Sequence, residues 1–419
     1  MKISVRAAIY FVFCTIISTT RFWGTNVGNS VRYILAALMT LYIIACLCDN
    51  RNSFVSLRKG IIVNHVHYIV KPYLVFAIYT LVIWLFNDNV FFRNYTRLAS
   101  TILYLILAWG FVCYGFYLFG KKALDYTFWA GVVSYILGSV LPLAFYYGPI
   151  YVWRYFAGSL VGKELAGSYY MEVHDLTFAM GFYFLYYLFF ENKSEKLHKT
   201  KVVIALFMIV FGLKKIEILA LVLSMAIYLL MMRKGKSTTF KSVIFFVGFT
   251  VGAFAYIYLT KSGLLDALTV KLGLDAKNRI GYYSYAAKYF EITPFYFGQG
   301  YTYFSRLWAQ LYLEHFRIDG YAIAAALHSD ILVMYIEVGF LPFIWWIYYS
   351  FVKKVKLIKR NYGNVVSECA LLLTIYLFTL YLTDNTSTYF ITQMAYLLVL
   401  LSASENRNQI EMNYIEENS

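Results

Sequence analysis

A histidine and two carboxylates stand just after residues 261–325, the one long stretch of this chain that does not read as membrane-spanning. His328 is followed two residues later by Asp330, and Glu337 comes about two helical turns beyond Asp330. An imidazole can act as a general base on a hydroxyl near neutral pH, and a carboxylate can orient it. In one continuous helix His328 and Asp330 would point about 200° apart, so the two need not form a dyad. His328 with these carboxylates predicts proton transfer at a hydroxyl. The alternative is that His328 is a structural histidine at the membrane interface.

Six cations in loops are candidates for binding a phosphorylated group: Arg154, Lys214, Lys215, Arg279, Arg306 and Arg317. A guanidinium fork matches two phosphate oxygens and keeps its charge at every relevant pH. Each cation could equally be a solvated loop charge or a contact to lipid headgroups. Arg279 is distinguished by its position on one face of a predicted short helix that Pro294 ends. The other members of that face are Tyr283, Ala286 and Phe290.

Aromatic side chains are dense in the same long segment. The chain has 42 tyrosines and 36 phenylalanines, and the segment contains Tyr282, Tyr283, Tyr285, Tyr289, Tyr296, Tyr301, Tyr303 and Trp308. Aromatic rings stack on the apolar faces of sugars, and they also anchor loops at the level of lipid headgroups. The sequence leaves sugar binding and anchoring both open.

The elements that must position these residues are membrane-spanning helices. With 61% hydrophobic and 14% charged residues, the 419-residue chain lacks the polar surface of a soluble globule. Apolar runs of spanning length recur at residues 5–20, 31–48, 70–87, 98–119, 125–146, 172–190, 201–213, 216–232, 241–260, 326–351, 366–383 and 387–402. We predict an all-α, polytopic integral membrane protein of about twelve transmembrane helices. Residues 1–402 would form a single transmembrane domain, and residues 403–419 a disordered cytoplasmic tail.

Positive charge predicts the orientation of these spans, because lysine and arginine in short loops stay cytoplasmic. With both termini inside, the inner segments hold about three times as many of these residues as the short outer loops. Residues 261–325 then face away from the cytosol, without direct access to nucleotide sugars. Residues 214–217 interrupt the apolar run 201–232, and a charge at the bilayer centre costs about 2.5–3.5 kcal/mol, which favours a hairpin with its tip at the outer face.

Several function classes are disfavoured by missing motifs. The chain has no G-x-x-x-x-G-K-[ST], H-E-x-x-H or G-x-S-x-G sequence, which argues against a P-loop pump, a membrane zinc protease and a serine hydrolase. Its five cysteines lack zinc-site spacing. The basic residues lie in short clusters between spans, so no nucleic-acid partner is expected. The first outer loop, residues 21–30, has no acidic residue, and we therefore expect a mechanism without a metal or other cofactor.

Four short segments follow one another along the chain in this order: Arg154-Tyr155-Phe156-Ala157-Gly158, Gly212-Leu213-Lys214-Lys215, Arg279 with Pro294 and Gly298-Gln299-Gly300, and His328-Ser329-Asp330-Ile331-Leu332 with Glu337-Val338-Gly339. These segments resemble motifs of the O-antigen and capsular polysaccharide polymerases (Wzy-type) and O-antigen ligases. Two positions depart from the family pattern, since His174 and Ser329 stand where asparagine is usual. The likeness extends over the whole predicted topology, although each motif is short.

The resemblance implies a GT-C-like, metal-independent polymerase of the bacterial cytoplasmic (inner) membrane. Such an enzyme transfers a growing glycan from undecaprenyl pyrophosphate onto an incoming lipid-linked repeat unit. Arg279 and Arg154, with Lys214 or Lys215, would bind the pyrophosphate, and His328 would position or deprotonate the acceptor hydroxyl. Arg306, Arg317, Asp330 and Glu337 are the further candidates for substrate binding. A chain-length regulator and a flippase of the same pathway are the implied protein partners, beside the lipid bilayer itself.

Three other functions remain open at this point. A ligase would hand the polymer to a different acceptor, and the sequence does not identify that acceptor. A lipid-linked oligosaccharide transporter or flippase would need charged or broken helices along a path through the bilayer, whereas polar residues here gather toward one face. A glycan-binding sensor or scaffold would use the long segment without turnover.

Overall fold

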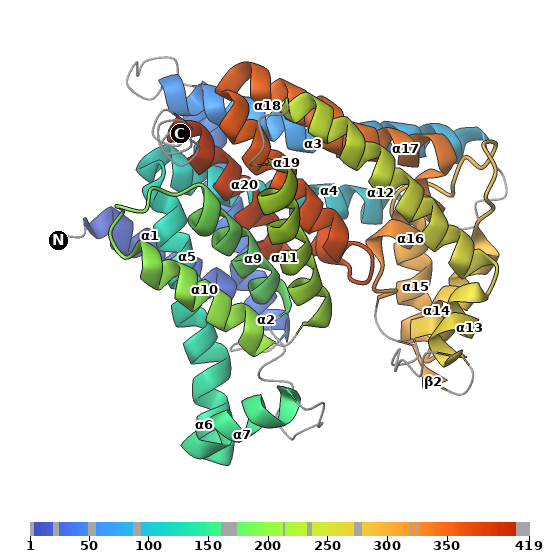
Figure 1. The fold of residues 1–419 in the computed structure, drawn as a ribbon, viewed down its shortest axis with the longest axis horizontal. Coiled ribbons are helices and arrows are strands. Elements are labelled where there is room, and N and C mark those ends of the chain that lie inside the picture. The colour runs from blue at the N-terminus through green and yellow to red at the C-terminus, as the bar shows by residue number, and fades with distance from the viewer. Residues whose placement is uncertain are drawn as a thin grey trace.

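The structure is a computed structural model that describes residues 4–19, 25–48, 56–86, 94–160, 174–212, 214–232, 237–271, 279–318, 321–323 and 326–407. The described part is mainly helical (Figure 1), and its strands form one hairpin of two-residue strands in which Arg317 lies opposite Ala322. The all-α fold class is therefore confirmed. The elements up to the long segment are α1 (Val5–Ser18), α2 (Thr25–Cys48), α3 (Ser56–Phe86), α4 (Tyr95–Phe119), α5 (Lys122–Tyr135), η2 (Ile136–Val140), α6 (Leu141–Tyr147), α7 (Pro149–Leu160), α9 (His174–Phe189), α10 (His198–Gly212), α11 (Lys215–Ile227), η3 (Tyr228–Met232) and α12 (Thr238–Lys261). The remaining elements are α13 (Leu264–Lys271), α14 (Arg279–Ala286), η4 (Ala287–Tyr289), α15 (Tyr303–Leu313), β1 (Arg317–Ile318), β2 (Tyr321–Ala322), α16 (Asp330–Val338), α17 (Phe340–Tyr348), η5 (Tyr349–Lys353), α18 (Lys354–Tyr362), α19 (Asn364–Leu380), η6 (Thr386–Thr388) and α20 (Phe390–Glu405).

Membrane character is carried by five helical stretches that, within the described ranges, are long and apolar enough to cross a bilayer. They are Ser30–Cys48, Leu57–Phe86, Tyr95–Phe119, Lys122–Tyr147 and Thr238–Lys261. Three shorter apolar helices, Val5–Ser18, Asn364–Leu380 and Phe390–Glu405, accompany them. The count of about twelve spans and the GT-C-like arrangement stay predictions.

Helix α3 differs most from its predicted span, because it begins at Ser56 rather than near residue 70. Two polar side chains in the added stretch have tertiary partners. The Asn64 side-chain amide donates to the Tyr362 hydroxyl at 3.0 Å, and Nε2 of the buried His65 lies 2.7 Å from the Ser404 hydroxyl. Buried polar groups with partners do not interrupt a helix, so the predicted start of this span near residue 70 is wrong.

The predicted break inside residues 201–232 is present. Helix α10 ends at Gly212, and α11 begins at Lys215. Gly212 packs closely on α9, since a Cβ atom there would lie 2.4 Å from the Thr177 side chain. Two separate helices are therefore correct for this stretch, and their orientation in a bilayer stays a prediction.

Helices α19 and α20 form the centre of the bundle. All residues of α19 from Val365 to Leu380 are buried, and so are those of α20 from Phe390 to Ser404. Helix α20 packs against α3, α4 and α9, and α19 packs against α11 and α18. Helix α2, by contrast, exposes large apolar side chains such as Ile34 and Leu38, as expected for a helix that faces lipid.

The long segment after α12 folds into α13, α14, η4, α15 and the β1–β2 hairpin at one end of the molecule (Figure 1). The predicted short helix beginning at Arg279 is present as α14. Lys261, at the end of α12, donates from Nζ to the carbonyl oxygens of Ala287 and Phe290, at 2.6 Å each. Helix α3 holds the other side, because Nε1 of Trp84 donates to the Gln299 carbonyl oxygen at 3.0 Å. The segment is thus bound to the helical bundle at both ends.

Candidate active site

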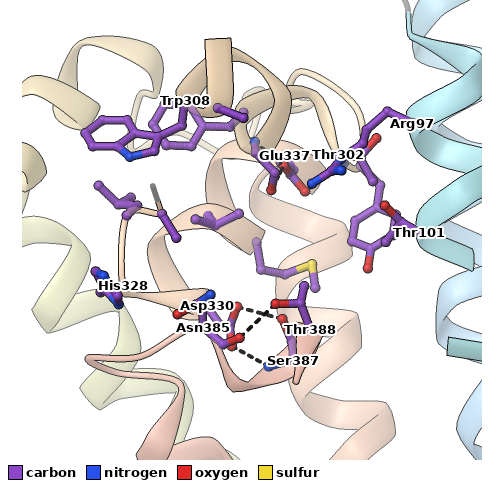
Figure 2. Close-up of a pocket in the computed structure, with 18 residues that line it drawn as sticks. Arg97, Thr101, Thr302, Trp308, His328, Asp330, Glu337, Asn385, Ser387 and Thr388 are labelled. Carbon is purple, nitrogen blue, oxygen red and sulfur yellow. Dashed lines mark hydrogen bonds between the residues drawn. The ribbon is translucent and has the colours of Figure 1, made fainter. Parts of the chain in front are cut away.

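A pocket of about 140 Å³ lies where the long segment meets the bundle. Figure 2 shows its labelled lining: Arg97 and Thr101 from α4, Thr302 and Trp308 from the long segment, His328, Asp330 and Glu337 at α16, and Asn385, Ser387 and Thr388 from the turn between α19 and α20. Four separate parts of the chain therefore meet here. The volume is close to that of a cavity that admits one benzene ring, so the pocket accommodates a single ring or phosphate group at a time.

His328 is held at both its backbone and its ring. The Tyr283 hydroxyl donates to the His328 carbonyl oxygen at 3.0 Å, and Nδ1 of the imidazole lies 3.8 Å from Oδ1 of Asp384. That separation is too long for a hydrogen bond, and Nδ1 has no hydrogen-bond partner among the described residues. It is short enough for an ion pair once the ring is protonated. The carboxylate nearest His328 is therefore Asp384, and neither Asp330 nor Glu337 orients the ring directly.

Asp384 is kept ionised by its surroundings. Burial alone would raise the pKa of its carboxyl group, but neighbouring donors and the His328 ring outweigh burial and leave the pKa below its ordinary value of 3.8. The donors are the Asn385 backbone N–H at 2.8 Å and the Tyr389 hydroxyl at 2.9 Å. Because these groups favour the charged form, Asp384 is an anion near neutral pH.

Asp330 ties the first turn of α16 to the turn between α19 and α20. Its carboxylate accepts hydrogen bonds from the Ser387 backbone N–H at 2.7 Å and the Ser387 hydroxyl at 2.6 Å, drawn as dashed lines in Figure 2. Its own N–H donates to the Asp384 carbonyl oxygen at 3.1 Å. Helix α16 is capped by Ser329, whose hydroxyl accepts from the Leu332 N–H at 3.4 Å. Asp330 thus holds Asp384 and Ser387 at the pocket.

Glu337 performs the same task on the opposite wall. It is 1% exposed, and its carboxylate accepts from the Thr302 N–H at 2.8 Å, the Ser305 N–H at 2.9 Å and the Ser305 hydroxyl at 2.8 Å. The backbone carbonyl oxygen of Glu337 accepts from the Gly300 N–H at 2.7 Å. Glu337 therefore fixes the start of α15, which carries Trp308 into the pocket.

Close backbone approach explains two glycines in this wall. Gly298 has φ +81°, and a Cβ atom there would lie 2.5 Å from the Glu337 carbonyl oxygen. Gly339 has φ +80°, and a Cβ atom there would lie 2.3 Å from the Phe297 carbonyl carbon. Each side of this contact therefore excludes a side chain. The glycine-x-glycine stretch and the glutamate-x-glycine stretch of the sequence thus pack directly on one another.

Two strained residues line the pocket. Among the described residues, non-glycine positive φ occurs at Leu197, Thr302, His315 and His328. Thr302 (φ 72°) and His328 (φ 56°) both belong to the lining. A β-branched residue rarely adopts this conformation, and such strain gathers at functional sites, where the surrounding contacts must hold it. Glu337 supplies that contact for Thr302, and Tyr283 supplies it for His328.

The structure distributes the sequence-predicted site residues unevenly. His328, Asp330 and Glu337 come together in the pocket, and Arg306 on α15 and the exposed Arg317 on β1 do not line it. Arg154 is exposed on α7, which lies away from α14–α16 in Figure 1. Lys214 and Lys215 lie at the break between α10 and α11 and are also not in the lining.

Arg279 is the first residue of α14, and its side chain lies outside the described residues. Its position on the helix is informative nevertheless. Tyr283, the residue bonded to His328, follows Arg279 by one helical turn on the same face. Residue 279 therefore lies one helical turn before Tyr283, the residue that hydrogen-bonds to the His328 backbone.

Sequence reasoning missed Arg97 and the turn that carries Asp384. Arg97 lines the pocket on the side opposite His328 (Figure 2). Asn94 caps α4 by accepting from the Arg97 N–H at 2.8 Å, which sets the first turn of the helix. A signal existed for both. Arg97 is a cation beside a predicted outer loop, and residues 384–388 are an unbroken polar run that extends from the end of one predicted span into the start of the next.

The fold and the pocket together define an α-helical protein of membrane character with a strained, hydrogen-bonded site at the edge of its helical bundle. Within the described part of the chain, no group of three or more histidine, cysteine, aspartate or glutamate residues could hold a metal ion. Comparison with known protein families, with curated proteins and with solved structures finds no match.

Proposed function

We propose that this protein is a polysaccharide polymerase of the bacterial cytoplasmic membrane. It would transfer a growing glycan from undecaprenyl pyrophosphate onto an incoming lipid-linked repeat unit at the outer face. The observation that supports the proposal is that His328, Asp330 and Glu337 line one pocket, while the 298–300 stretch packs on the end of α16 through the 2.7 Å hydrogen bond from the Gly300 N–H to the Glu337 carbonyl oxygen. Two of the four segments that resemble the polymerase and ligase motifs therefore meet here.

In the proposed reaction, the acceptor hydroxyl oxygen bonds to the anomeric carbon of the growing chain. The bond from that carbon to the pyrophosphate oxygen breaks, and undecaprenyl pyrophosphate leaves with the electron pair. His328 takes the hydroxyl proton, and the adjacent Asp384 carboxylate, 3.8 Å from Nδ1, stabilises the imidazolium that forms. No metal or cofactor is needed for these steps.

The departing pyrophosphate carries negative charge that cations must offset. Arg97 lies in the pocket lining, and Arg279 begins the helix that contacts His328. A pre-placed donor of this kind is worth roughly 10² to 10³ in rate. Trp308 supplies an aromatic face suited to the apolar side of a sugar ring. Because the pocket holds about one ring or one phosphate group, it would enclose only part of the reacting groups, with the lipid and the rest of the glycan outside.

The test is to reconstitute the purified full chain in lipid vesicles with defined undecaprenyl-pyrophosphate-linked repeats. We expect longer glycans on the lipid carrier and release of undecaprenyl pyrophosphate. Transfer only when another acceptor is added would identify a ligase instead. Movement of labelled lipid-linked sugar across the bilayer without bond formation would identify a transporter, and binding without either would contradict an enzyme. Stimulation by a chain-length regulator or a flippase of the pathway is a separate outcome of the same assay.

A further inference from the structure

A second, smaller cavity of about 40 Å³ lies inside the bundle between α3, the α17–η5–α18 helix, α19 and α20. Its lining includes Lys354, Tyr349, Tyr396, Gln393 and Tyr73. No aspartate or glutamate of the described chain lines it. The lining is therefore built from hydroxyl, amide and ammonium groups among apolar side chains.

Lys354 is the charged group of this cavity. It is 6% exposed, and its Nζ donates to the Tyr396 hydroxyl oxygen at 2.5 Å and lies 5.1 Å from the centre of the same ring. Among the described residues, no carboxylate lies within ion-pair distance of it. A phenol can share a hydrogen bond with an ammonium group, but it does not neutralise the charge.

The other buried lysines of the described chain differ in this respect. Lys241 pairs with Glu368 at 2.8 Å, and Lys201 pairs with Asp125 at 3.0 Å and with Glu191. Removing an unpaired ammonium group from water costs several kcal/mol, which is why buried charges are normally paired. Lys354 therefore differs from Lys201 and Lys241, because among the described residues it has no carboxylate partner.

Tyr349 is an independent sign of a ligand. Its side chain is 2% exposed and lines the cavity, yet its hydroxyl has no hydrogen-bond partner among the described residues. It opens η5, a π-helical turn over Tyr349–Lys353 that directly precedes Lys354. Single π-helical turns inside α-helices occur often at functional sites. An unused donor and an unpaired cation thus face the same space.

We infer that this cavity binds a small monovalent inorganic anion, a halide such as chloride, through the Lys354 ammonium group and the Tyr349 hydroxyl. The volume corresponds to about one to three water molecules, which suits a monatomic ion and is too small for phosphate or an organic acid. The anion would neutralise Lys354 and satisfy Tyr349 together. This site is separate from the pocket at His328 and does not depend on the proposed function.

The experiment measures thermal unfolding of the full chain in detergent while sodium gluconate is replaced by sodium chloride at constant ionic strength. A ligand that binds only the folded state raises the unfolding temperature in a saturable way. We expect such a rise for the wild-type protein and no chloride dependence for Lys354→Met. Lys353→Met is the matched control, since it removes the neighbouring exposed lysine of the same helix and should keep the dependence.

Tyr349→Phe keeps the charge and removes one donor, so it should shift the chloride concentration for half-maximal effect upward by about tenfold. This variant also carries the test if Lys354→Met does not fold. A wild-type protein whose unfolding is indifferent to chloride would mean that water fills the cavity, and it would overturn the inference. A chloride effect unchanged in Tyr349→Phe or in Lys354→Met would place the anion elsewhere and would overturn it as well.

Discussion

The imidazole Nδ1 of His328 lies 3.8 Å from the Oδ1 atom of Asp384, a residue on the turn between the two most deeply buried helices. The Asp384 carbonyl oxygen also accepts a hydrogen bond from the Asp330 N–H. The distance between His328 and Asp384 is therefore set by how the helices pack and not by the local chain. A carboxylate in this place stabilises the protonated ring. Much of the proposed chemistry therefore depends on how α19 and α20 dock against α16.

His328→Ala and Arg279→Ala should each leave the protein inserted and abundant while stopping chain growth. The physical reason is the loss of the proton acceptor in one variant and of a phosphate-binding charge in the other. Lipid-linked single repeats should accumulate on a gel in place of a ladder of chain lengths. Normal ladders in both variants would remove these residues from the catalytic role.

Asp384→Asn should slow chain growth by about ten- to a hundredfold, because an amide does not stabilise an imidazolium as a carboxylate does. Asp266→Asn, at an exposed position on α13, is the matched control and should grow chains at the normal rate. The decisive measurement is a double-mutant cycle with His328→Ala, read by thermal unfolding because chain growth stops in that background. Asp384→Asn should cost less stability there if its carboxylate interacts with the His328 ring, and an additive loss would indicate a role elsewhere.

Arg97→Ala should reduce the rate by roughly 10² to 10³ if its guanidinium group binds the leaving pyrophosphate. Arg97→Lys should recover part of the loss, since an ammonium group keeps the charge without the bidentate fork. Arg154→Ala is the comparison, because Arg154 is exposed on α7 and does not line the pocket. The opposite ranking of the two alanine variants would place the pyrophosphate away from this pocket.

Gly298→Ala should destabilise the protein by about 1–3 kcal/mol and displace the 298–305 turn, because a Cβ atom there meets the Glu337 backbone at 2.5 Å. Gly148→Ala is the control that separates the steric clash of the new Cβ atom from the cost of a positive φ. Gly148 has φ +89°, but a Cβ atom at this position would meet nothing within 4 Å, so this variant carries only the cost of the left-handed backbone. Thermal unfolding of both variants in detergent gives the comparison. Equal losses would mean that the 298–339 contact adapts to a side chain.

Stability should fall in acid through Asp384. Its folded-state pKa is lower than that of the unfolded chain, so the ionised group stabilises the fold above about pH 4. That contribution is lost as the pH falls through the folded-state pKa. The wild-type protein should therefore unfold at a higher temperature than Asp384→Asn at about pH 5, and this margin should shrink as the pH falls below about 4. A margin independent of pH down to strong acid would show that the carboxylate contributes nothing through its charge.

Much of the helical framework follows from the sequence. Hydropathy predicts the all-α class and most helix positions, including the break before Lys215 and the short helix at Arg279. The predicted span 70–87 missed the early part of α3, which holds Asn64 and His65. Their partners, Tyr362 and Ser404, come from the other end of the chain, and no local pattern reveals them.

The candidate site divides in the same way. Sequence alone determined that His328, Asp330 and Glu337 lie along one apolar stretch of the chain, because spacing along one element is a local property. Tertiary structure alone decided that Asp384, and not Asp330, faces the imidazole, that Glu337 holds the strained Thr302, and that Arg97 closes the pocket from α4. Side chains on different helices meet only through the packing of those helices, which depends on the shape of every buried residue between them.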